Sequence, residues 1–187
     1  MVKVKINNAD YSIPTKIEDL TVGQFFALRT ANTIVEEICA LAGIDKETIL
    51  NLKSYKDVVA AQVLVSQFGV VLSKGFNTYK RPKQITFGGK TINIPMDLKL
   101  EPVGAFISVH DILATQTNKF MKDGGEVDYT DQIPLTLAHY LYVPYTGELY
   151  SDEKAEGSEF MEKINEIRFV DAVPIANFFF RKYPNLN

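Results

Sequence analysis

One segment of the chain contains residues typical of phosphate chemistry. Residues 87–91 read Phe-Gly-Gly-Lys-Thr and include the Gly-Lys-Thr triplet that ends a phosphate-binding loop. In such a loop, backbone N–H groups and the lysine surround the phosphates, and the hydroxyl residue binds Mg²⁺. The motif also requires a glycine where Gln84 stands and a helix after the threonine, whereas Ile92 and Ile94 continue a strand pattern. We therefore interpret the segment as the turn of a β-hairpin.

Histidine and cysteine are scarce in this sequence. His110 and His139 are the two histidines and Cys39 is the single cysteine. Neither histidine has Cys, His or carboxylate companions at metal-ligand spacing, and no Gly-x-Ser-x-Gly elbow occurs. The sequence therefore predicts no catalytic residue, metal site or cofactor. A small cytoplasmic enzyme is kept as an alternative, which a pocket that pairs one histidine with a carboxylate would favour.

A basic segment in the middle of the chain combines cations with aromatic residues. Such a mixture can contact phosphates and stack on bases, which makes nucleic acid a candidate partner. A polar crossover with its aromatic side chains turned inward is the other interpretation, and we prefer it. The four candidate contact residues are Lys74, Lys80, Arg81 and Lys83.

An aromatic run near the C-terminus is the strongest internal sign of assembly. Three consecutive aromatic residues cannot all face one core from a single helix. Burial between two subdomains is one explanation. An interface anchor is the other, because aromatic residues and arginine are enriched in interface hot spots. The candidate interface residues are Phe178, Phe179, Phe180, Arg181 and Tyr183.

A pattern that occurs twice, about 81 residues apart, indicates the elements that position these residues. Residues 6–28 align with residues 87–109, and each copy reads as a hairpin ending in Ile-Pro, a short spacer and a helix. We predict an α+β fold, mainly helical, with two β-hairpins in an internally duplicated arrangement. The predicted units are 1–80 and 81–187, sharing one core. The aligned pairs are Ile13-Pro14 with Ile94-Pro95, Val22-Gly23 with Val103-Gly104, and Phe25 with Phe106.

Local signals predict where several helices begin. Thr21 with Gln24 forms a capping box, Asp45 can cap a short helix after the stop at Gly43, and Ser54 can cap a strongly apolar helix. Further helices are predicted over 102–121, 131–142, from Ser158 onward and over 170–182. Residues 144–157 are rich in Pro, Gly, Ser and acidic side chains, so we predict a flexible insertion there.

The composition limits the class of partner. The chain has 187 residues, with 20 basic and 23 acidic side chains and a formal net charge of -3. This balance does not favour a dedicated nucleic-acid-binding protein, and no segment predicts a membrane span. The N-terminus alternates apolar and charged residues, which is a strand pattern and not a signal peptide. We therefore expect the protein to be made in a cytoplasm.

The first fifty or so residues carry a resemblance. A hairpin ending in Ile13-Pro14, then residues 17–25 (Ile-Glu-Asp-Leu-Thr-Val-Gly-Gln-Phe) and residues 42–45 (Ala-Gly-Ile-Asp), resembles small proteins in the structural modules of tailed bacteriophages, including crAss-like phages. In those modules such proteins are similar to virion ring components or tail assembly chaperones.

The resemblance contains no catalytic residues. It implies a non-enzymatic virion protein that forms a homo-oligomer or docks with other phage proteins in a ring at the head–tail or tail region. The alternative that it implies is a soluble tail assembly chaperone that does not stay in the particle.

Overall fold

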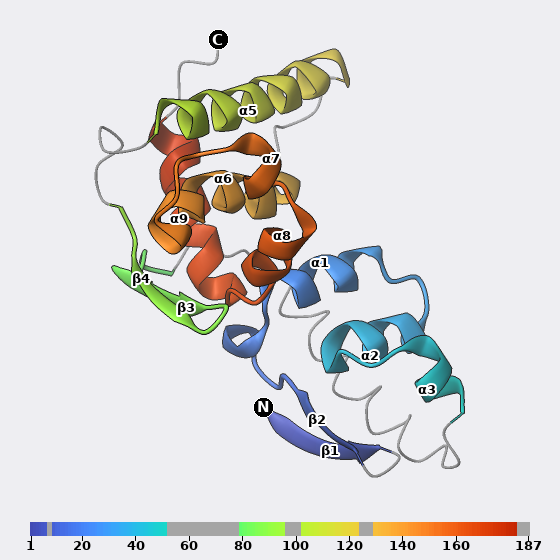
Figure 1. The fold of residues 1–187 in the computed structure, drawn as a ribbon. Coiled ribbons are helices and arrows are strands. Elements are labelled where there is room, and N and C mark those ends of the chain that lie inside the picture. The colour runs from blue at the N-terminus through green and yellow to red at the C-terminus, as the bar shows by residue number, and fades with distance from the viewer. Residues whose placement is uncertain (7–8, 52–78, 96–101, 124–128, 183–187) are drawn as a thin grey trace. The chain divides into compact units, whose positions relative to one another are not determined.

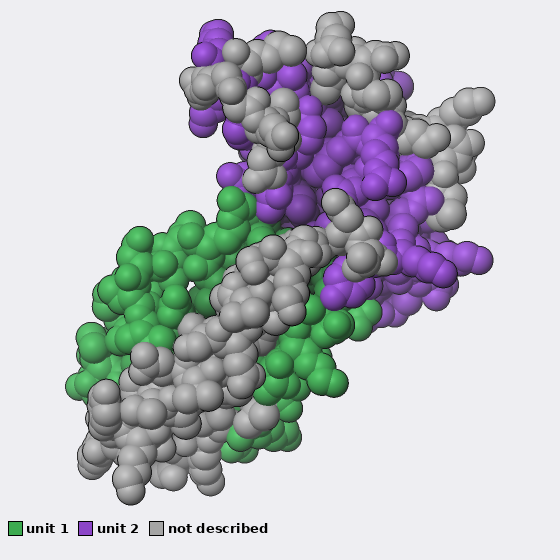
Figure 2. Space-filling view, turned by 180° about the vertical axis from the view of Figure 1, so that it is seen from behind, with its two compact units in different colours: residues 1–76, 168–170 green, residues 77–167, 171–187 purple. Residues whose placement is uncertain are grey.

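The computed structural model describes residues 1–6, 9–51, 79–95, 102–123 and 129–182. The fold is α+β and mostly helical (Figure 1). The chain forms two compact units (Figure 2). Unit 1 contains Met1–Phe76 and Arg168–Val170, and unit 2 contains Asn77–Ile167 and Asp171–Asn187. The predicted apolar helix after Ser54 lies outside the described residues, as do Lys74 and Tyr183. A core shared by the two predicted units stays a prediction.

Unit 1 begins with an antiparallel strand pair and continues with helices. Strand β1 (Val2–Ile6) pairs with β2 (Ala9–Ile13), with Val2 opposite Ile13. The turn residues between them lie outside the described part of the chain. The helical elements that follow are the 3₁₀ turn η1 (Ile17–Asp19), α1 (Val22–Thr30), α2 (Ile34–Ala42) and α3 (Lys46–Leu50).

The predicted helix ends of unit 1 are confirmed. The Thr21 hydroxyl accepts a hydrogen bond from the Gln24 N–H, and the Gln24 side chain accepts one from the Thr21 N–H. The Asp45 carboxylate caps α3 by accepting a hydrogen bond from the Thr48 N–H, and Gly43 ends α2 with a φ of 64°. Each of these signals works within one turn of chain, which is why the sequence is sufficient to predict them.

A ring stack forms part of the buried centre of unit 1. The Phe25 ring of α1 stacks on Phe169 with centroids 3.6 Å apart and planes 14° apart. The Phe169 N–H donates to the Leu20 carbonyl at 2.7 Å, and Thr21 forms a β-bridge with Arg168. Leu20 and Phe169 are fully buried. A segment late in the sequence therefore completes the packing of the first unit.

The hairpin of unit 2 confirms the interpretation of the Gly-Gly-Lys-Thr segment. Strand β3 (Gln84–Phe87) pairs antiparallel with β4 (Lys90–Asn93), and the two turn residues Gly88 and Gly89 have φ values of 51° and 73°. Two consecutive positive φ values are typical of a type I′ hairpin turn. The Tyr145 hydroxyl donates to the Gly88 carbonyl at 2.7 Å, so this turn is fastened to the helices of the unit.

Helices make up the rest of unit 2. Figure 1 shows α6 surrounded by the other helices of the unit, and most of its side chains are buried, including Leu137, Ala138, Tyr140 and Leu141. The helical elements are α5 (Val103–Asp123), the 3₁₀ turn η3 (Thr130–Gln132), α6 (Ile133–Thr146), α7 (Asp152–Ala155), α8 (Ser158–Asn165) and α9 (Phe169–Lys182), whose first two residues count with unit 1.

The predicted flexible insertion at 144–157 is wrong. Helix α6 continues through Pro144 to Thr146, and residues 152–155 form α7, capped by the Ser151 hydroxyl. Ala155 is fully buried, and Tyr150 packs against α5. The acidic side chains misled the prediction, because they lie on the outer faces of elements whose few apolar residues hold them in place.

Candidate functional site

The predicted aromatic interface residues lie mostly inside unit 2. Phe179 is fully buried, and its ring centroid lies 3.7 Å from that of Tyr140 on α6. Phe180 is half-buried, with its ring 5.1 Å from that of Tyr129. Phe178 is half-buried as well and contacts the edge of Phe179. Phe179 thus points into the core, while its neighbours Phe178 and Phe180 are only partly buried. Phe179 therefore offers no surface to a partner.

The structure brings the basic segment and the aromatic run together. The guanidinium carbon of Arg81 lies 3.7 Å from the centre of the Phe178 ring, a cation–π contact. Lys80, Lys83 and Arg181 are exposed. Arg81 is therefore committed to packing within unit 2, whereas the two lysines remain at the surface. A nucleic-acid contact at these lysines stays a prediction.

Helix α5 carries an exposed apolar face that the sequence analysis did not single out. Val103, Phe106 and Ile107 keep 73%, 41% and 51% of their surface accessible. Their spacing of i, i+3 and i+4 places them side by side on one face of the helix. The opposite face is buried through Ala105, Val109 and Leu113. The first two turns of α5 thus have two apolar faces, of which one is buried in the core and the other is exposed.

Leu149 is a further exposed apolar residue of unit 2. It is 93% exposed and precedes Tyr150 in the chain. The Tyr150 ring lies against Gly104, so close that a Cβ on Gly104 would stand 2.5 Å from the ring. This contact fixes the Tyr150 ring against the first turn of α5. We call the surface formed by Val103, Phe106 and Ile107 the α5 patch.

A polar network lies beside the first turns of α5. The Tyr150 hydroxyl donates to Asp152 Oδ1 at 2.6 Å and lies 2.7 Å from His139 Nδ1 and 3.1 Å from Ser108 Oγ. The Ser108 hydroxyl also donates to Asp152 Oδ1. His139 is on α6, Ser108 on α5, and Asp152 begins α7. One tyrosine hydroxyl therefore links three helices of unit 2.

The electrostatics of this network follow from burial. The His139 side chain is completely buried, which lowers its pKa, although the carboxylates of Glu156 and Asp152 partly oppose this shift. Hydrogen bonds from Ser108 and Tyr150 lower the pKa of Asp152. Burial and the hydrogen bond to Asp152 raise the pKa of Tyr150. The arrangement therefore favours a neutral imidazole, a protonated phenol and an ionised Asp152.

The second nitrogen of His139 is less well placed. Nε2 is buried without a hydrogen bond of good geometry, while Glu156 Oε1 lies 3.3 Å away. A neutral ring that donates from Nδ1 to Tyr150 lets Tyr150 donate onward to Asp152, so one chain of donors runs through the network. Because Nε2 then presents a lone pair toward a carboxylate, a proton at this point would bind both groups.

The geometry of the network supports positioning better than catalysis. A serine nucleophile is activated by a base that accepts its proton, whereas the Ser108 hydroxyl donates to Asp152, whose lowered pKa makes it a weak base. His139 has no exposed side-chain surface on which a substrate could bind. The structure does pair a histidine with carboxylates, but that histidine does not line the cavity described next.

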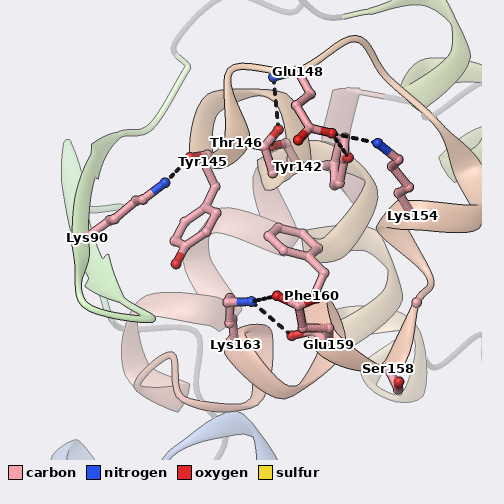
Figure 3. Close-up of a pocket in the computed structure, with 11 residues that line it drawn as sticks. Lys90, Tyr142, Tyr145, Thr146, Glu148, Lys154, Ser158, Glu159, Phe160 and Lys163 are labelled. Atoms are coloured by element: carbon pink, nitrogen blue, oxygen red, sulfur yellow. Dashed lines mark hydrogen bonds and ion pairs between the residues drawn. The ribbon is translucent and has the colours of Figure 1, made fainter.

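A surface cavity of about 640 Å³ lies between the end of α6, α7 and α8 (Figure 3). Two of its lysines are neutralised: Lys154 pairs with Glu148 at 2.8 Å and Lys163 with Glu159 at 2.6 Å. The lining residues are Lys90, Tyr142, Tyr145, Thr146, Glu148, Lys154, Gly157, Ser158, Glu159, Phe160 and Lys163.

The remaining lysine of the cavity holds a helix end. The Lys90 amino group donates to the Tyr145 carbonyl at 3.4 Å and lies 4.8 Å from the centre of the Tyr145 ring. That carbonyl belongs to the last turn of α6, where a positive charge is favourable. The charged groups of the cavity are thus largely engaged with one another and with α6.

Metal sites and membrane-spanning helices are two further features that bear on function. Over the residues that the structure describes, no three His, Cys, Asp or Glu side chains gather where they could hold a metal ion. In the same residues, none of the helices combines the length and the apolar character that a membrane crossing requires.

Comparisons with known proteins add no relatives. A scan against protein-family models, a search of curated proteins and a search of solved structures each gave no match.

Sequence reasoning missed the exposed face of α5, because its residue pattern resembles that of the buried face of α1. The repeat aligns Val103 with Val22 and Phe106 with Phe25. Val22 and Phe25 are buried, at 0% and 4% exposure. The same residue types at the same spacing thus face the core in unit 1 and solvent in unit 2. Sequence alone carries no signal for this difference, because it depends on whether another segment covers the helix.

Proposed function

We propose that this chain is a non-enzymatic structural protein that acts through contact with other proteins. The α5 patch is the observation that supports this mode of action. Its three side chains expose on the order of 300 Å² of apolar surface, the size of the largest patches on soluble monomers, which are often functional. The polar network beside the patch adds support, since it links α5 to α6 and α7 and so reduces the entropy lost on binding.

The proposed setting is a tailed-phage virion, in which the chain forms a ring or docking subunit at the head–tail or tail region. The support for this setting is the sequence resemblance of residues 13–25 and 42–45. In the structure these residues include the end of β2, η1, the start of α1 and the cap of α3. A soluble tail assembly chaperone is the alternative, because it would use the same kind of apolar surface.

We also propose that the two hairpin-and-helix units arose by duplication. Two features support this. Ile13 and Ile94, which the alignment pairs, are each 3% exposed, and each ends a strand pair.

The proposal is tested by one charged substitution in the patch. Ile107→Glu should weaken association with itself or with particle proteins at least tenfold, because a carboxylate would be buried in the contact. Thr115→Glu is the matched control, since Thr115 is exposed on the same helix and lies outside the patch. Association is measured by light scattering of the protein alone and by co-sedimentation with particle proteins. Equal association of both variants and the unaltered protein would refute the proposal.

Mass spectrometry of purified particles separates the two settings. Detection of the chain in mature particles supports the virion subunit, whereas its presence only in assembly intermediates or infected-cell extract supports the chaperone. Turnover of a small molecule that is lost on a single substitution in the cavity of Figure 3 would instead favour an enzyme.

A further inference from the structure

We infer that strand β3 pairs edge to edge with β3 of a second copy of this chain, antiparallel and about a two-fold axis at Ile85. The two hairpins would then form one sheet in the order β4-β3-β3-β4. The inference rests on the proposed function, because it names one contact through which such a protein assembles. That contact uses residues other than those of the α5 patch.

The hydrogen bonds of the hairpin show which backbone groups face outward. The Ile94 N–H donates to the Lys83 carbonyl at 2.8 Å, and bonded and non-bonded residue pairs alternate along an antiparallel ladder. The N–H and C=O groups of Gln84 and Thr86 therefore point away from β4. Both residues are exposed, and no described residue outside the hairpin bonds these backbone groups. They are thus available to an added strand.

Strand β3 lacks the features that normally protect a sheet edge. Proteins keep edge strands from pairing with charged side chains, prolines and bulges. Among the strands that the structure describes, β1, β2 and β4 each contain a lysine or an aspartate, whereas β3 reads Gln-Ile-Thr-Phe. Its register with β4 is regular at every residue. Of the described edges, β3 is therefore the one best suited to strand addition.

The free backbone groups of β3 complement themselves in one register. With the axis at Ile85, Gln84 of each copy lies opposite Thr86 of the other, and each of these two pairs exchanges two N–H···O bonds. A shift in one direction brings in Pro82, which has no N–H. A shift in the other direction brings in Gly88, whose N–H already donates to Glu166 and whose carbonyl accepts from Tyr145. The ends of the strand thus select the two-fold register.

Charge complementarity favours a second copy as the occupant. In this register Lys83 lies opposite Phe87 of the other copy, one residue from the Gly88 N–H that holds Glu166 Oε2 at 2.8 Å. Lys83 and Glu166 are both exposed. Side chains alternate along a strand, so Lys83 is on the same face as Phe87, the face that packs on α6. The two-fold axis brings Lys83 and Glu166 together twice.

The outer face of the hairpin is already ordered for such a contact. The Gln84 amide donates to Asn93 Oδ1 at 2.8 Å, and the Thr86 and Thr91 hydroxyls lie 2.8 Å apart. Side chains that are held in place before binding lose little entropy when the strands pair. Because the edge is short, we expect a reversible dimer.

Paired charges on this outer face test the register. Gln84→Lys with Thr86→Glu places opposite charges against each other across the axis and should strengthen the dimer, whereas Gln84→Lys with Thr86→Lys opposes like charges and should weaken it. The dissociation constants of the two variants should differ by roughly tenfold, because two cross-strand pairs change sign. Thr91→Lys with Asn93→Lys is the matched control: it adds the same charge on β4 and should leave the dimer unchanged. Light scattering over a range of concentrations gives each constant.

The outcomes of this experiment decide the inference. Equal dissociation constants for the two β3 variants, or equal weakening by the β4 control, would overturn the β3 contact. Reversal of the proposed ion pair gives a second reading: Lys83→Glu should weaken the dimer, and Lys83→Glu with Glu166→Lys should restore it. A double variant that is weaker than Lys83→Glu would contradict the register. Circular dichroism confirms that each variant is folded before its association is compared.

The failure of this inference and that of the proposed function give different results. A chain that is monomeric at every concentration, yet loses binding to particle proteins on Ile107→Glu, refutes the β3 dimer and retains the proposed function. A chain that dimerises through β3, but binds no particle protein through the α5 patch, retains the dimer and refutes the proposed role of that patch. A chain that neither dimerises nor binds particle proteins refutes both.

Discussion

Gly104→Ala tests the packing between α5 and Tyr150, because the physical effects of this substitution oppose each other. Gly104 is the second residue of α5, and replacing glycine by alanine in a helix normally stabilises a protein by up to about 1 kcal/mol. Here the new Cβ would stand 2.5 Å from Cδ1 and 2.6 Å from Cε1 of Tyr150, closer than carbon atoms approach. The ring must therefore move.

The magnitude follows from what the ring carries. The Tyr150 hydroxyl contacts Asp152, His139 and Ser108 at 2.6, 2.7 and 3.1 Å. A hydrogen bond to a charged group contributes about 1.5–3 kcal/mol, and a buried polar atom left without a partner costs about 1–3 kcal/mol. Adding these two losses and subtracting about 1 kcal/mol of helix propensity leaves a net loss of roughly 1.5–5 kcal/mol in the free energy of unfolding.

Urea unfolding followed by far-UV circular dichroism measures this loss. The same substitution is then made beside Tyr150→Ala, where the ring is absent and the Cβ has room. In that background Gly104→Ala should no longer destabilise and should stabilise by up to about 1 kcal/mol. A loss of equal size in both backgrounds, or a gain in the presence of Tyr150, would refute the reasoning.

Three further outcomes are expected. Burial lowers the pKa of His139 from its ordinary 6.5, so the stability that depends on its neutral form is complete above pH 6.5 and is lost as the pH falls below it. Denaturant titrations between pH 7 and 5 should show this decline, and His139→Gln should flatten it; an unchanged slope would contradict the assignment. Phe179→Ala should destabilise by about 3–5 kcal/mol in thermal unfolding, and Phe178→Ala by clearly less, since only Phe179 is fully buried. Gly88→Ala should cost more than Gly89→Ala, because both have positive φ but only at Gly88 would a Cβ collide with the Tyr145 hydroxyl; equal losses on urea unfolding would argue against that contact.

Local signals in the sequence predicted local structure well. The capping box at Thr21, the cap at Asp45, the stop at Gly43 and the Gly88-Gly89 turn are each satisfied by atoms a few residues away. The α+β class follows from the same kind of evidence, because alternation and helical periodicity are read over short windows.

The candidate site was beyond the reach of such signals. The sequence predicted neither a catalytic nor a metal-binding role for His139, and its partner Tyr150 lies in a segment predicted to be a flexible insertion. The exposure of Val103 and the burial of Phe179 depend on which helix covers which face, and identical residue types occur in both situations. Tertiary packing decides these positions, and periodicity along one helix does not record it.

The return of Arg168–Val170 to unit 1 has a consequence for the order of events during synthesis. Domains usually fold in the order in which they leave the ribosome. Here the N-terminal strands and α1 emerge early, but the Phe25 ring lacks its stacking partner until Phe169 has been synthesised. The nascent chain therefore carries an unfinished first half until translation is almost complete, and a release just short of Phe169 would leave that half without its final packing partner.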